Sequence, residues 1–149
     1  MPLVTTSLYT RDILRLAASI PHLGRLPNAA ATAEKSAPLC GSRVTVDLVL
    51  DEAGRVTALG QEVKACALGQ ASAALMGTHV IGRDAAALAE ARDALAAYLA
   101  GTSDDPGGWP GLDIFAAARA FPARHGAILL PFQAATDAAL LAAREGVTS

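Results

Sequence analysis

The stretch that decides the fold runs from Val44 to Leu50 and reads VTVDLVL. Apolar residues occupy every second position, which is the period of a β-strand with one buried face. Residues 51–54 follow as a turn, in which Gly54 is free to take a positive φ. The range 55–64 then predicts a second strand, antiparallel to the first. We expect the rest of the chain to be arranged around this hairpin.

The segment before the hairpin predicts one helix and one loop. Apolar residues from Tyr9 to Ile20 recur at helical spacing, and Pro21 ends the predicted helix. The range 21–38 contains three prolines and a run of small residues. It is predicted to be an extended loop.

The segment after the hairpin predicts helices. The first spans residues 67–76 and ends at Gly77, and the second runs from an N-cap at Asp84 to a C-cap at Gly101. A surface loop over 102–110 precedes a short helix near residues 112–119 and a last helix with Pro131 in its first turn. Because strands and helices are segregated along the chain, the predicted fold class is α+β.

Length and composition limit the classes of function. The chain has 149 residues, which suits a single domain over 1–149, and 52% of them are hydrophobic. The net charge of −2 offers no basic field for nucleic acid. The N-terminus lacks the pattern of a signal peptide, and no apolar run approaches the roughly 20 residues of a membrane helix. We therefore expect a cytoplasmic protein with neither nucleic acid nor membrane as a partner.

Two cysteines flank the predicted hairpin. Cys40 lies just before the first strand and Cys66 just after the second, so the open end of the hairpin would bring them together. Cys66 also stands at a predicted helix N-terminus, where unpaired N–H groups favour a thiolate. Gly41, beside Cys40, would let a ligand approach the backbone closely.

The residues alone leave several interpretations of these thiols open. Cysteine often packs as a small apolar group, and a structural disulfide is not expected in the cytosol. The thiols could also be metal ligands or reactive groups. Two cysteines without a CxxC motif are weak evidence for zinc, which normally takes four ligands.

Three sequence motifs point to a known family. The stretches around the two cysteines, Pro38-Leu39-Cys40-Gly41 and Cys66-Ala67-Leu68-Gly69, are similar to its first and second cysteine motifs, and residues 19–26 are similar to its N-terminal stretch. The chain resembles the IscU/NifU-like iron–sulfur cluster assembly scaffolds, particularly the SufU-type branch, over most of its length.

The chain departs from the family pattern at two positions. Ser42 stands where the family usually has an aspartate two residues after its first cysteine. The third cysteine is missing, because an ungapped reading puts Ala127 in its place. His125 lies two residues earlier, near a position where some members carry a histidine.

The resemblance implies a fold and a function. The expected fold is a small antiparallel three-stranded sheet packed against helices, as in SufE/NifU-like proteins. The expected role is that of a scaffold or metal-binding carrier rather than an enzyme. It would hold a transient [2Fe–2S] cluster or iron, with zinc as the alternative, on Cys40 and Cys66, with His125 as a third metal ligand. The expected partners are a cysteine desulfurase, iron–sulfur client or carrier proteins, and a second copy of the chain that could share a cluster.

Two other roles remain open at this stage. Loss of the third cysteine and the aspartate fits a degenerate scaffold-fold protein that acts as a protein-binding or regulatory module without cluster chemistry. A sulfur-transfer protein with persulfide on Cys40 or Cys66 is a further alternative.

Overall fold

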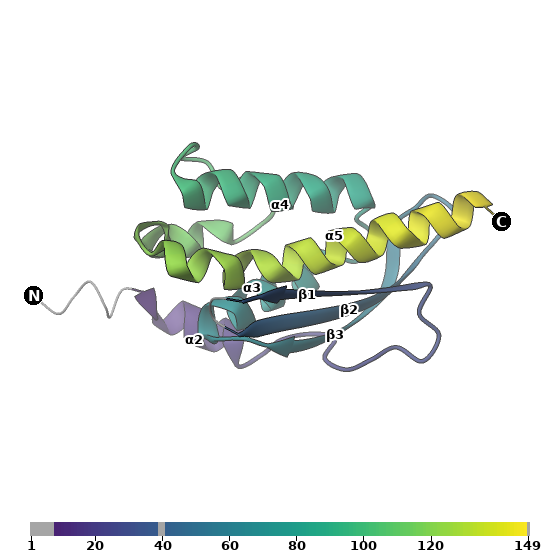
Figure 1. Cartoon of the computed structure of the whole chain (residues 1–149), viewed down its shortest axis with the longest axis horizontal. Helices are drawn as coiled ribbons and strands as arrows, with labels where there is room; N and C mark the ends of the chain where they lie inside the picture. The colour runs from purple at the N-terminus through teal and green to yellow at the C-terminus, as the bar shows by residue number, and fades with distance from the viewer. Residues whose placement is uncertain (1–7, 39–40, 149) are drawn as a thin grey trace, which may run out of the picture.

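The computed structural model describes residues 8–38 and 41–148, with side chains up to Arg144. Figure 1 shows the arrangement of the described elements. In chain order they are α2 (Arg11–Ala17), β1 (Ala31–Ala37), β2 (Ser42–Leu50), β3 (Val56–Lys64), α3 (Ala67–His79), α4 (Ala85–Ala100), the 3₁₀ segments η1 (Leu112–Ala120) and η2 (Pro122–Arg124), and α5 (His125–Thr148).

The sheet has three antiparallel strands in the order β1-β2-β3. The predicted hairpin is confirmed as β2 and β3, in which Arg43 pairs with Lys64 and Leu48 with Leu59. The three-stranded sheet and the α+β class are confirmed as well.

The prediction of a loop over the whole range 21–38 is wrong, because residues 31–37 form β1. The positions of β1 that face the helices are mostly alanine. Lys35 also lies on this side, where its Nζ forms an ion pair with Asp137 Oδ2 of α5 at 3.4 Å. Alanine is too weakly apolar to make the period of 2 evident in the sequence.

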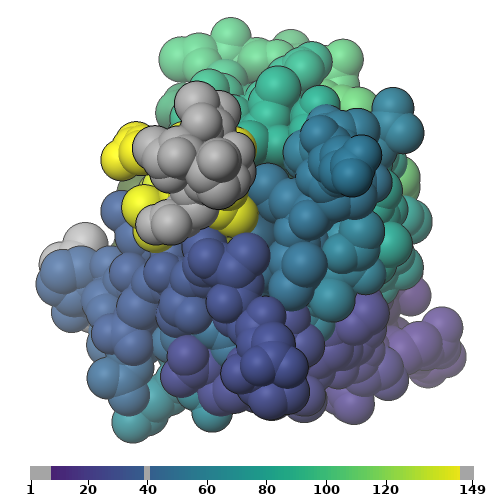
Figure 2. Space-filling model, turned by 90° about the vertical axis from the view of Figure 1, so that its right-hand side faces the viewer, coloured from purple at the N-terminus to yellow at the C-terminus, as the bar shows by residue number. Residues whose placement is uncertain are grey.

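The core lies between the sheet and the helices. Val44, Val46 and Leu48 of β2 have no exposed surface. Helix α5 packs on β1, β2, α3 and α4 at once (Figure 1). In the space-filling view of Figure 2, the purple and blue N-terminal third of the chain lies at the bottom and the green helical segment at the top.

One helix is longer and more apolar than the sequence analysis expected. The range Pro122–Arg144 spans 23 residues with a mean hydropathy of 1.4, enough by length and composition to cross a membrane. However, 61% of its most apolar window is buried inside the protein. This is the behaviour of the core helix in a layered domain.

Two predicted helix ends are wrong. Helix α3 continues through Gly77 to His79. A Cβ at Gly77 would lie 2.9 Å from Pro21 Cγ and 2.9 Å from Gln61 Nε2, so this glycine serves close packing rather than termination. Helix α5 begins at His125 and continues through Pro131, which is therefore not in its first turn.

Most other local predictions hold. Asp84 Oδ1 accepts from the Ala87 N–H at 2.8 Å, and Gly101 ends α4 with φ 82°. The range 102–110 has no helix or strand, but Trp109 is buried and its Nε1 donates to Leu75 O at 3.0 Å. The prediction that Pro21 ends the N-terminal helix is wrong, because α2 ends at Ala17 with Ala18 as its C-cap.

A buried carboxylate fixes residues 21–30 to the sheet. Asp47 accepts hydrogen bonds from Arg25 Nε at 2.6 Å, the Leu26 N–H at 3.0 Å and Thr32 Oγ1 at 2.5 Å. Burial works against its ionised form, but the hydrogen bonds from Arg25, Thr32 and Leu26 outweigh it and lower the pKa of Asp47. Gly60 lies opposite, where a Cβ would approach Gly24 O to 2.5 Å.

Candidate functional site

Several elements begin or end at one edge of the molecule. Strand β1 ends at Ala37, β2 begins at Ser42 and β3 ends at Lys64. The pairing of Arg43 with Lys64 puts Gly41, the last residue before β2, at the same end of the sheet as the start of α3. Cα atoms of such cross-strand partners are roughly 5 Å apart.

The connection between β1 and β2 is tight. The Gly41 N–H donates to Ala37 O at 3.0 Å, and Gly41 has φ 68°, a conformation that favours glycine. Cys40 lies outside the described residues. The predicted approach of its sulfur to that of Cys66 therefore stays a prediction.

Cys66 stands at the N-cap of α3. Its backbone is extended, with φ −67° and ψ 173°, and its side chain makes no capping hydrogen bond. The side chain is half-buried. The first turn of a helix presents N–H groups without helical partners, and these favour negative charge beside the cap. The predicted position of Cys66 at a helix N-terminus is confirmed.

Ala127, which stands in place of the missing third cysteine, lies close to the start of α3. Ala127 lies in the first turn of α5 with no exposed surface. A Cβ at Gly69, in the first turn of α3, would lie 3.1 Å from Ala127 O and 3.5 Å from Ala127 Cβ. A Cβ at the neighbouring Gly126 would lie 3.3 Å from Ala37 Cβ of β1. The start of α5 thus packs against α3 and β1, but the side chain at 127 offers only a methyl group.

His125 opens α5 and is held by one ring nitrogen. Its Nε2 lies 2.8 Å from Ala118 O in η1. A carbonyl oxygen only accepts hydrogen bonds, so Nε2 carries the proton and Nδ1 has the lone pair in the neutral ring. Histidines that bind metals usually donate their other N–H in this way.

Two small residues, Gly69 and Ser72, tie the elements around Cys66 together, and their packing role was not predicted from the sequence. Ser72 Oγ donates to Ile128 O at 2.5 Å, and Gly69 allows the contact with Ala127. Their spacing of three residues, one helical turn, is the sequence signal of a close helix contact. Ser42, in place of the family's aspartate, is almost fully buried.

The donors in the described part of the chain do not complete a metal site by themselves. Within residues 8–38 and 41–144, no group of three His, Cys, Asp or Glu side chains comes together.

Comparisons with known proteins agree with this architecture. The model of the NifU-like N terminal domain matches residues 8–124. No curated protein matches the chain. The crystal structure of a nitrogen-fixing NifU-like protein (N-terminal) from Brucella abortus is 37% identical, with a TM-score of 0.89 over 95% of this chain and 99% of that one.

A second solved structure shows the same fold at lower identity. It is a protein from thermophilic Fervidobacterium islandicum, proposed as an iron–sulfur cluster assembly scaffold for the SUF system. It is 23% identical, with a TM-score of 0.81 over 89% of this chain and 96% of that one. The match of the family model across most of the chain, together with the Brucella structure, decides the family: the chain belongs to the NifU-like N-terminal domain family of iron–sulfur cluster assembly scaffolds.

Proposed function

We propose that this protein is a scaffold or metal-binding carrier in iron–sulfur cluster assembly, with Cys40 and Cys66 as the sulfur ligands of its cargo. The observation that carries the proposal is the position of Cys66 at the N-cap of α3, without a capping bond and at the same end of the sheet as Gly41. Cys40 precedes Gly41 in the sequence, and its thiol is the second ligand that we propose for this end.

The ligand count decides which cargo the site can hold. Cys40, Cys66 and the Nδ1 of His125 would supply three ligands, and water could complete the four that zinc or iron takes. A [2Fe–2S] cluster normally takes four protein ligands. We therefore propose that iron or zinc binds to a single chain, and that a cluster forms with a ligand from a second molecule.

The proposal includes partners and a cellular location. A cysteine desulfurase would supply the sulfur, and iron–sulfur client or carrier proteins would receive the cargo. The chain itself would be cytoplasmic and would not act as an enzyme. Its net charge of −2 supports a role without nucleic acid.

Restoring the third thiol should strengthen iron binding. Ala127→Cys places a sulfur beside the first turn of α3, because Ala127 packs against Gly69. After anaerobic reconstitution with ferrous iron and sulfide, we expect wild type to retain iron and Ala127→Cys to retain about tenfold more after dilution or chelator challenge. Iron per chain and visible absorption are the measurements.

The matched control is Ala127→Ser, which adds an atom of similar position but no soft ligand. It should behave as wild type. Colourless, iron-free protein from both wild type and Ala127→Cys would refute the scaffold role.

A second candidate function is a protein-binding or regulatory module of the same fold without cluster chemistry. The methyl group of Ala127 and the buried Ser42 at the family's ligand positions favour it. The Cys40→Ser/Cys66→Ser double variant separates the two roles. Unchanged cellular function in this variant supports the module, and loss of function supports the scaffold.

A further inference from the structure

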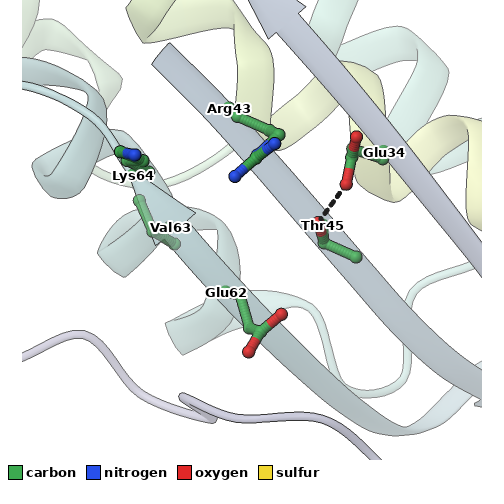
Figure 3. A pocket seen from close by; sticks show the side chains of 6 residues that line it. All are labelled: Glu34, Arg43, Thr45, Glu62, Val63 and Lys64. Atoms are coloured by element: carbon green, nitrogen blue, oxygen red, sulfur yellow. Dashed lines mark hydrogen bonds between the residues drawn. The ribbon is translucent and has the colours of Figure 1, made fainter.

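The face of the sheet turned away from the helices carries a charged hollow. In Figure 3 the helices lie behind the strands, and polar side chains stand on the open face. The hollow has a volume of about 380 Å³ and is lined by Glu34, Arg43, Thr45, Glu62, Val63 and Lys64.

The charges on this face form two bands across the strands. Arg43 of β2 and Lys64 of β3 are cross-strand partners and make a basic band. Glu34 of β1 and Glu62 of β3 both lie beside Thr45 of β2 and make an acidic band. The bands are two residues apart along the strands, which is about 7 Å.

The two bands do not neutralise each other within the chain. Neither Arg43 nor Lys64 forms an ion pair with a described residue. Glu34 Oε1 accepts from Thr45 Oγ1 at 3.1 Å. Among the described residues, Glu62 forms one long ion pair, of 4.0 Å, with the half-exposed Arg25. Arg43 and Lys64 are like charges directly opposite each other on neighbouring strands, which is unfavourable, so the basic band gains from a negative charge brought by a partner. The acidic band, with Glu34 and Glu62 on either side of Thr45, offers that charge.

We propose that this face associates with a second copy of the chain through its two charge bands. The two-fold axis runs between the two bands, parallel to the sheet and across the strands. It places the basic band of each copy over the acidic band of the other. Lys64 then faces Glu62 of the second copy, and this contact occurs twice. A partner with one sign of charge would be repelled by one band, whereas a second copy matches both.

The geometry of the contact predicts a weak dimer whose interface does not include the proposed metal site. The face is small and its charges are exposed, so the association is weak and salt-sensitive. The side chains of each copy project into the hollow of the other. The axis points the two Cys66 ends in opposite directions, so this contact does not bring the two thiol ends together and does not depend on cluster chemistry.

Charge exchange at two positions tests the proposal. Either single variant, Lys64→Glu or Glu62→Lys, gives residues 62 and 64 the same charge. The two copies then repel each other at this contact, and each variant should be monomeric. An equimolar mixture of the two should form a heterodimer, and the double variant Lys64→Glu/Glu62→Lys should dimerise again because its bands remain complementary. Sedimentation equilibrium at low ionic strength measures all four, with single variants weakened about tenfold or more.

Two controls make the result decisive. Glu90→Lys, an equal charge change on exposed α4, should dimerise as wild type does. Wild type should dissociate in about 1 M salt, where the screening length is about 3 Å. A wild type that is monomeric at low salt, a dimer unaffected by the single variants, or a mixture that stays monomeric would each overturn the proposal. All substituted residues are exposed, and circular dichroism confirms that each variant folds.

Discussion

Replacing Cys66 by serine is expected to abolish retention of iron or zinc. Cys66 is the one cysteine in the described part of the chain, and it stands half-exposed at the start of α3. Serine keeps the size but offers a hard hydroxyl in place of a thiolate. Iron per chain after anaerobic reconstitution and desalting should fall about tenfold or more relative to wild type.

The control for this result is Gln70→Ala, one turn further along α3 and without a thiol. It should retain iron as wild type does. If Cys66→Ser binds as much iron as wild type, the sulfur of Cys66 is not a ligand and the proposed function is wrong.

Replacing Asp47 by alanine should cause the largest loss of stability. The change removes the acceptor for Arg25, Leu26 and Thr32 and releases the segment that crosses Gly60. Because Arg25 is half-exposed and can be hydrated, the loss falls at the lower end for a broken ion pair. We expect the free energy of unfolding in urea to fall by about 2–3 kcal/mol.

The comparison variant is Thr45→Ala on the same strand and face. It loses one hydrogen bond, to Glu34, and should cost about 1 kcal/mol or less. Equal stabilities of Asp47→Ala and Thr45→Ala would show that the buried carboxylate does not hold the segment.

The same carboxylate gives stability a dependence on pH. Folding lowers the pKa of Asp47 below its ordinary value of 3.8. Its ionised form therefore stabilises the folded state fully above this value, and the contribution is lost as the pH falls through the lowered pKa. Between pH 5 and pH 2, wild type should lose more stability than Asp47→Asn does. Parallel urea curves for the two proteins over this range would contradict the assignment.

Elements with strong local signals were predictable from the sequence. The alternating apolar residues of β2 fixed the hairpin with β3, and Asp84 and Gly101 marked both ends of α4 because caps are local hydrogen bonds. β1 was missed, since its pairing with β2 comes from tertiary contact rather than its own pattern. Gly77 and Pro131 were misread as helix boundaries because packing overrides their local preference.

The candidate site was predictable only in part. The helical pattern after the hairpin correctly placed Cys66 at a helix N-terminus. The contact between Gly69 and Ala127 joins residues 58 positions apart, and no local pattern reports such a contact. Asp47 is buried because residues 21–30 cover its face of the sheet, and the alternating pattern of the strand carries no sign of that cover.

The central claim is that the thiols of Cys40 and Cys66 bind one ion. Zinc X-ray absorption spectroscopy of the loaded wild-type protein measures this directly, because sulfur ligands at about 2.3 Å are distinct from nitrogen and oxygen ligands at about 2.0 Å. Two sulfurs per zinc in the wild-type protein is the predicted result. A first shell of nitrogen and oxygen alone would contradict it.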